Sequence, residues 1–124
     1  MRFAKWVFLL SGVYGLIVIT PMYFLEGAIS RNSVPITHPE NFYGFVGAAF
    51  AFQILFLTIS RDPRRYRPAM IAAVLEKATF GIAVSALFAQ GRAATPVMVF
   101  ASIDMLWGVL FAVSWFLTAP GRDA

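Results

Sequence analysis

Four stretches of the chain run for about 20 residues with almost no charged side chain, and short polar connections separate them. They cover residues 6–25, 42–60, 69–91 and 97–118. A helix needs about 20 apolar residues to cross the hydrocarbon core of a bilayer. The pattern therefore predicts an all-α fold, an integral membrane four-helix bundle, with residues 1–124 forming a single transmembrane domain.

Polar residues and prolines mark where these spans begin and end. Pro21 lies near the end of the first span, where its ring removes one backbone hydrogen bond and predicts a bend. Thr37 and Glu40 have the spacing of a capping box just before the second span. Thr95, which precedes a proline, is the expected N-cap of the fourth span.

The first span also has some features of a secretory signal peptide, because it follows the basic residues Arg2 and Lys5. However, its apolar run is longer than a usual signal core, and Glu26-Gly27-Ala28 is a poor cleavage site. We therefore predict a retained first helix.

Composition supports a lipid environment. Hydrophobic residues make up 60% of the chain and charged residues only 13%, whereas soluble domains are about 25% charged. The chain has no cysteine, which excludes disulfides, thiol redox chemistry, Cys-ligated zinc and iron-sulfur clusters.

Basic residues in the connections predict the orientation. Seven flank the spans on the side of the termini: Arg2, Lys5, Arg61, Arg64, Arg65, Arg67 and Arg122. The other side has only Arg31 and Arg92. The positive-inside rule then places both termini in the cytoplasm. We interpret the net charge of +4 as a topology signal and predict no nucleic-acid partner.

Small residues predict how the helices pack, because close approach of backbones drives much of the association in lipid. The second span has the small-residue pairs Gly44/Ala48 and Gly47/Ala51, and the third has a stripe at Ala69, Ala73, Lys77 and Gly81. We therefore expect the second and third spans to form an antiparallel hairpin.

Ionisable and amide groups inside the spans are the candidates for function, since such residues are expensive in a bilayer. Gln53 and Glu76 lie at similar distances from the Arg61–Arg67 turn, so we expect them to face each other. Lys77 is expected to extend toward the headgroups.

Asp104 is expected at a separate level, nearer the other membrane surface. It should be buried against another helix and protonated unless a cation pairs with it, and Arg31 and Arg92 are the nearest cations by depth. Gln53, Glu76 and Asp104 are thus candidate ligand-binding or proton-binding residues. The alternative is that they are hydrogen-bonded packing contacts.

The sequence offers no catalytic motif. It has no phosphate-binding glycine pattern and no serine in a nucleophile elbow, and its single histidine, His38, cannot form a His-rich metal centre. We predict no metal, no cofactor and no catalytic residue.

A resemblance rests on the four spans, the short second loop Arg-Asp-Pro-x-x-Tyr-Arg-Pro and the adjacent Glu76 and Lys77. With these features the chain resembles small bacterial inner-membrane proteins of the broad DoxX-like type. The resemblance implies a compact four-helix bundle in the bacterial inner membrane, in a family sometimes described as partners of redox enzymes.

Three functions follow as hypotheses. The first is a non-enzymatic bundle that binds a hydrophobic small molecule, a lipid or a partner subunit, with a homo-oligomer left open. The second is a small proton-coupled exporter, although the first span lacks the glutamate that such exporters carry there. The third is a membrane enzyme acting on a lipid-like substrate with Glu76 and Asp104 as acid and base. The separate levels expected for these two residues argue against it.

Overall fold

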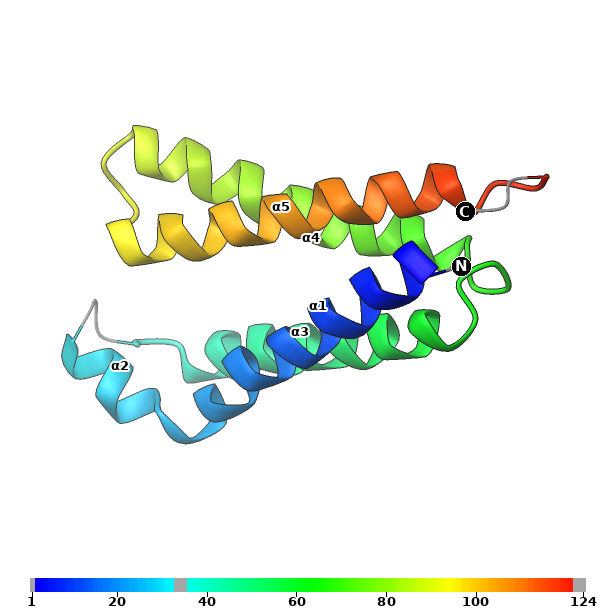
Figure 1. Ribbon diagram of the computed structural model, residues 1–124. Helices are drawn as coiled ribbons and strands as arrows, with labels where there is room; N and C mark the ends of the chain where they lie inside the picture. The colour runs from blue at the N-terminus through cyan, green and yellow to red at the C-terminus, as the bar shows by residue number, and fades with distance from the viewer. Residues whose placement is uncertain (1, 33–35, 122–124) are drawn as a thin grey trace.

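The computed structural model describes residues 2–32 and 36–121, and all regular structure within them is helical (Figure 1). The elements are α1 (Arg2–Ile19), a 3-10 helix η1 (Thr20–Phe24), α2 (Glu26–Asn32), α3 (Pro39–Arg61), α4 (Ala69–Ala89) and α5 (Thr95–Leu117). Four segments, α1 with η1, α3, α4 and α5, are long and apolar enough to cross a membrane. The predicted fold class is confirmed. Arg122 and Ser33 lie outside the described residues.

The helix ends agree with the sequence in some places and differ in others. α1 gives way to a 3-10 helix at Thr20, with Pro21 in its first turn, so the regular α-helix ends beside the proline where a bend was predicted. The predicted capping box is wrong: His38 is the N-cap of α3, and the Thr37 hydroxyl lies 3.1 Å from the His38 ring Nδ1 instead. Likewise, the N-cap of α5 is Ala94, and Thr95 is already in the helix.

Two further differences lie in the connections. The polar segment after the first span contains the short helix α2, which was not predicted. α4 ends at Ala89, and Gly91 then adopts a positive φ of 73°, a conformation that glycine tolerates best. The third span is thus two residues shorter than expected.

The helices pair as α1 with α3 and α4 with α5, and α3 makes few contacts with α4. The predicted hairpin of the second and third spans is therefore wrong. On the second span, most of the small residues that suggested it face no other helix closely: a Cβ at Gly44 would meet nothing within 4 Å, and Ala48 and Ala51 are exposed.

Closer approach is found on α1. A Cβ at Gly12 would lie 2.7 Å from Leu57 Cδ2, and a Cβ at Gly15 would overlap the Gln53 carboxamide. These two glycines allow α1 to pack tightly on α3. The sequence alone provides no measure of which small-residue face the helices use.

The α4–α5 pair uses the stripe that the sequence identified on the third span. Ala73, Lys77 and Gly81 are all buried. Gly81 leaves room for Met105, and Gly108 lies against the Lys77 side chain, at 3.1 Å from an added Cβ to Lys77 Cβ. The stripe is thus a packing face, but its partner is α5 and not α3.

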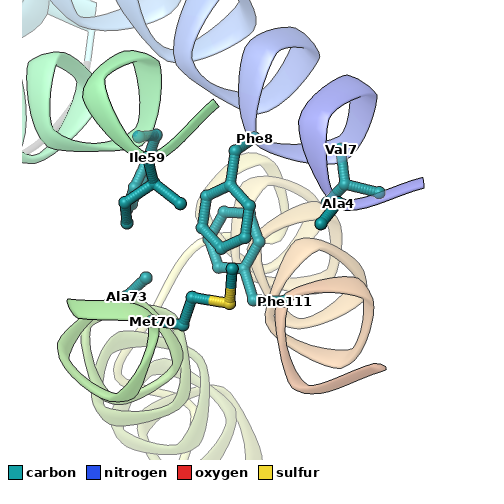
Figure 2. Close-up of a cluster of buried hydrophobic side chains, with 8 residues drawn as sticks. Ala4, Val7, Phe8, Ile59, Met70, Ala73 and Phe111 are labelled. Carbon is teal, nitrogen blue, oxygen red and sulfur yellow. The ribbon is translucent and has the colours of Figure 1, made fainter. Parts of the chain in front are cut away.

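The two hairpins meet at an aromatic junction, which we define as Phe8 of α1, Phe56 of α3, Phe111 of α5 and Met70 of α4. All four are fully buried. Phe8 stacks on Phe111 with ring centroids 4.3 Å apart and an interplanar angle of 7°, and Phe56 packs against Phe111 at 4.9 Å. Figure 2 shows the stacked pair with Met70 beside it.

The junction lies toward the end of the bundle where the two termini and the α3–α4 connection are found (Figure 1). At this end Arg67 joins the connection to α5: its Nε donates to the Trp115 carbonyl at 2.9 Å, and its guanidinium lies 3.9 Å from the Trp115 ring centroid. We call this the terminal half. At the opposite end, beside α2 and the α4–α5 turn, the hairpins lie apart.

Candidate functional site

A cavity of about 440 Å³ lies between the two hairpins. Helices from both hairpins, together with α2, contribute to its wall. Most of the wall is apolar, and the side chains include Val18, Ile29, Phe45, Phe80, Val97 and Phe100. This part of the bundle, which we call the cavity half, therefore contains a cavity between the apolar helices.

Four side chains with an amide or a charged group reach the same cavity: Gln53, Glu76, Lys77 and Asp104. All three residues proposed from the sequence as binding candidates are among them. Gln53 comes from α3, Glu76 and Lys77 from α4, and Asp104 from α5. The packing of the hairpins thus collects polar groups that are far apart in the sequence.

Lys77 lies at the centre of this group. Only 3% of the residue is exposed, and its Nζ lies 3.3 Å from Asp104 Oδ1, to which it donates a hydrogen bond, and 3.5 Å from Glu76 Oε1. The ammonium also lies 5.3 Å from the Phe56 ring centroid. The expectation that Lys77 extends toward the headgroups is wrong, because two carboxylates and an aromatic ring hold it inside the bundle.

The same contacts overturn the expected separation of Glu76 and Asp104 into two levels. α4 ends earlier and α5 begins earlier than expected, at Ala89 and Thr95. At 1.5 Å per residue, the remaining difference in depth between the two carboxylates is about 6 Å. The long Lys77 side chain bridges this difference and pairs with both.

The two arginines that were the nearest predicted cations for Asp104 do not pair with it. Arg92 is exposed and donates to Gln90 Oε1 at 3.0 Å, beyond the end of α4. Arg31 lies in the last turn of the short helix α2. The sequence did contain a signal for the correct partner: Lys77 is the only charged member of the small-residue stripe that packs on α5.

Gln53 is held on the other hairpin. Its Nε2 donates to the Ala49 carbonyl at 2.9 Å, and its carboxamide lies against Gly15 of α1. Gln53 and Glu76 both line the cavity, as the sequence suggested they would meet, but no hydrogen bond joins them among the described side chains.

Three buried side-chain oxygens in the described part of the chain accept no hydrogen bond: Ser11 Oγ, Gln53 Oε1 and Glu76 Oε1. Buried polar atoms nearly always have a partner, so each of these is unusual. Two of the three belong to residues that line the cavity. The site therefore has an excess of hydrogen-bond acceptors.

Tyr14 is a cavity residue that the sequence did not single out. It lies on α1, with its ring 6.2 Å from the Trp107 ring of α5. A tyrosine in an apolar span is usually interpreted as an anchor at the membrane–water interface. Only the pairing of the hairpins shows that this hydroxyl-bearing ring reaches the polar group.

The arrangement does not resemble a metal centre. In residues 2–32 and 36–121 no three His, Cys, Asp or Glu side chains gather closely enough to hold an ion. The two carboxylates that do approach each other share an ammonium group, which would compete with a cation for them.

Together, fold and site define a small all-helical membrane protein with a polar group inside its bundle. No family model matches the sequence, and neither do the characterised proteins or the solved structures with which it was compared. The resemblance to DoxX-like proteins stays a prediction from architecture.

Proposed function

We propose that the protein binds a small amphiphilic molecule in the cavity between its two hairpins, with Gln53, Glu76 and Asp104 near the head of the ligand. The observation that carries the proposal is the cavity itself. Its volume of about 440 Å³ falls in the range of small-molecule sites. An apolar wall with a few convergent polar groups is typical of such sites.

A small molecule fits this site better than a partner subunit does. The polar groups lie in a concave space between the hairpins, whereas a helix of another protein would pack on the outer surface of the bundle. Lys77, Gln53 and the aromatic junction beneath them are buried in the single chain. The ligand would therefore enter a site already formed.

The shared position of Glu76 and Asp104 removes the depth argument against a membrane enzyme. Even so, the polar group contains no serine, threonine or cysteine beside a general base: its members are an amide, two carboxylates and the ammonium that pairs with them. A binding function requires only what these groups provide.

The test is photolabelling of the purified protein with dodecanol that carries a diazirine near the middle of its chain. Mass spectrometry should find the label on cavity residues of α1, α3, α4 or α5. Val18→Trp, which places a large ring at the cavity wall, should reduce this labelling severalfold.

The matched control is Ile17→Trp on the same helix, because Ile17 is 69% exposed and faces away from the cavity. It should label like the original protein. Equal labelling of the two variants, or labelling confined to the outer surface, would contradict the proposal.

The location in the cell is part of the proposal. We place the protein in a bacterial inner membrane with both termini in the cytoplasm, because the Arg61–Arg67 connection is rich in basic residues. Cysteines introduced at positions 64 and 92 should react differently with an impermeant thiol reagent in intact cells. Labelling of position 64 and not of position 92 would contradict the proposed orientation.

A further inference from the structure

We infer that the head of the ligand is a protonated primary or secondary amine. This inference rests on the proposed function and adds the chemical class of the molecule. It is carried by two features of the cavity: the charges of its ionised groups, and the buried oxygens of Gln53 and Glu76 that accept no hydrogen bond.

The ionised forms of the cavity's charged groups do not balance. Among the described residues that line the cavity, Lys77 is the only basic one, and it stands between the two carboxylates of Glu76 and Asp104. With all three ionised, the group has one more negative than positive charge. A ligand with a single positive charge would bring this group to neutrality, which a low-dielectric site favours strongly.

The buried hydrogen-bond acceptors of the cavity also outnumber the donors that reach them. Gln53 is 2% exposed, and its Oε1 has no donor, while its Nε2 is already used by the Ala49 carbonyl. Glu76 Oε1 accepts no hydrogen bond, although it lies 3.5 Å from the Lys77 ammonium. Both residues line the cavity, so a ligand that carries N–H donors would find acceptors there.

These two features discriminate among head groups. A quaternary ammonium supplies the charge but no donor, and an alcohol supplies a donor but no charge. A carboxylate or phosphate would add negative charge beside Glu76 and Asp104. A protonated alkylamine has the same chemistry as a lysine side chain and is charged at neutral pH, so it supplies both.

The wall of the cavity determines the chemistry of the rest of the ligand, beyond its head. Phe45, Phe80, Val97 and Phe100 are apolar and come from three different helices. The amine must therefore carry a hydrocarbon or aromatic body. A small hydrophilic amine would have to leave water without gaining apolar contact.

The experiment compares three dodecyl diazirine probes that differ only in the head: a primary amine, a trimethylammonium and an alcohol. Each is titrated against the full-length protein in the same detergent at neutral pH, and labelling of cavity residues is quantified by mass spectrometry. A charge-assisted hydrogen bond predicts half-maximal labelling by the amine at about tenfold lower concentration than by either other probe.

Two variants test the origin of the preference. Glu76→Gln and Asp104→Asn each remove the excess negative charge while keeping the shape, so each should reduce the advantage of the amine over the alcohol. Their matched controls are Glu40→Gln and Asp62→Asn, because Glu40 and Asp62 are exposed and outside the cavity. The controls should keep the tenfold preference.

Each outcome decides between the two proposals. If all three probes label the cavity equally, the head-group inference is wrong and the binding function stands. If amine and trimethylammonium are equal and both exceed the alcohol, charge alone acts and the inference is also wrong. If no probe labels the cavity, both proposals fail. Since the three-probe comparison uses the unmodified protein, it remains decisive even if a variant does not fold.

Discussion

The terminal half and the cavity half of the bundle use the same four helices in opposite ways. In the terminal half, the rings of Phe8, Phe56 and Phe111 fill the centre, and Arg67 joins the α3–α4 connection to α5 through a hydrogen bond. In the cavity half, the centre holds an ion-paired lysine and about 440 Å³ of space. One half is built for packing, and the other leaves room at the cost of packing.

The difference shows how a short chain can combine stability with an internal site. Lipid provides little hydrophobic reason for helices to associate, so van der Waals packing must do most of the work. The aromatic junction concentrates that packing in one place. The cavity half can then hold polar groups that contribute less to holding the helices together. Four substitutions would break or sharpen this contrast.

The largest effect is expected for Phe111→Ala. Phe111 contacts both other rings of the junction, and truncating it to alanine removes both contacts and leaves a void between the hairpins. A Phe→Ala change in a soluble core costs about 3–5 kcal/mol, and we expect about 2–4 kcal/mol here because lipid already solvates the apolar ring in the unfolded state.

The measurement is the free energy of unfolding in mixed micelles titrated with a denaturing detergent. Phe116→Ala serves as the control, since Phe116 is on the same helix and 62% exposed. If both variants unfold at the same detergent fraction, the junction does not stabilise the bundle as described.

A smaller loss is expected for Lys77→Met. It leaves Glu76 and Asp104 without their shared cation. Breaking a fully buried ion pair costs about 3–5 kcal/mol, and because both carboxylates are about one-fifth exposed we expect about 2 kcal/mol.

Charge removal provides the check on this explanation. Adding Glu76→Gln and Asp104→Asn to Lys77→Met should restore most of the lost stability, because the uncompensated carboxylates are then gone. A triple variant as unstable as Lys77→Met would show that the apolar part of the lysine, and not its charge, is what matters.

Gly15→Ala should cost about 1–3 kcal/mol, the usual range for overpacking. A Cβ at this position overlaps the Gln53 carboxamide, so either α1 moves away from α3 or Gln53 leaves its place in the cavity wall. Gly44→Ala on α3 is the matched control, because its Cβ would meet nothing, and it should be neutral or slightly stabilising. Thermal unfolding of both variants in the same detergent measures the difference; equal melting temperatures would contradict the contact.

The smallest effect is expected for Arg67→Lys, at about 0.5–1 kcal/mol. Lysine keeps the charge but cannot reproduce the planar stacking on Trp115 together with the directed bond to its carbonyl. Arg61→Lys, in an exposed position at the end of α3, should change nothing. A drop in Trp115 order, measured by fluorescence anisotropy after removing the other tryptophans, should accompany the first substitution and not the second.

The helices could be predicted from the sequence because each span is an independent physical unit. About 20 apolar residues in a row need lipid whatever their neighbours do, so α3 and α5 lie close to their expected bounds. The interruption at Pro21 follows from the missing backbone donor in the same local way.

Pairing could not be predicted, because several small-residue faces compete and only one arrangement forms. The sequence favoured Gly44 and Ala48 as a packing face, but the structure uses Gly12 and Gly15 instead. The candidate site shows the same division: Gln53, Glu76 and Asp104 were identifiable as costly intramembrane groups, whereas the role of Lys77 depended on which helix faced α4.

The position of Phe111 along α5 divides the helix into unequal arms. From this ring to Thr95 the helix extends about 24 Å, and to Leu117 only about 9 Å. A rotation of about 10° about the stacked rings would therefore displace the Thr95 end by about 4 Å and the Leu117 end by less than about 2 Å. The pivot of such a rotation would lie near one end of α5, with the longer arm on the side of the cavity. A change in crossing angle that barely disturbs the Arg67–Trp115 contact would therefore produce a larger displacement at Val97, where the wall of the cavity meets the start of the helix.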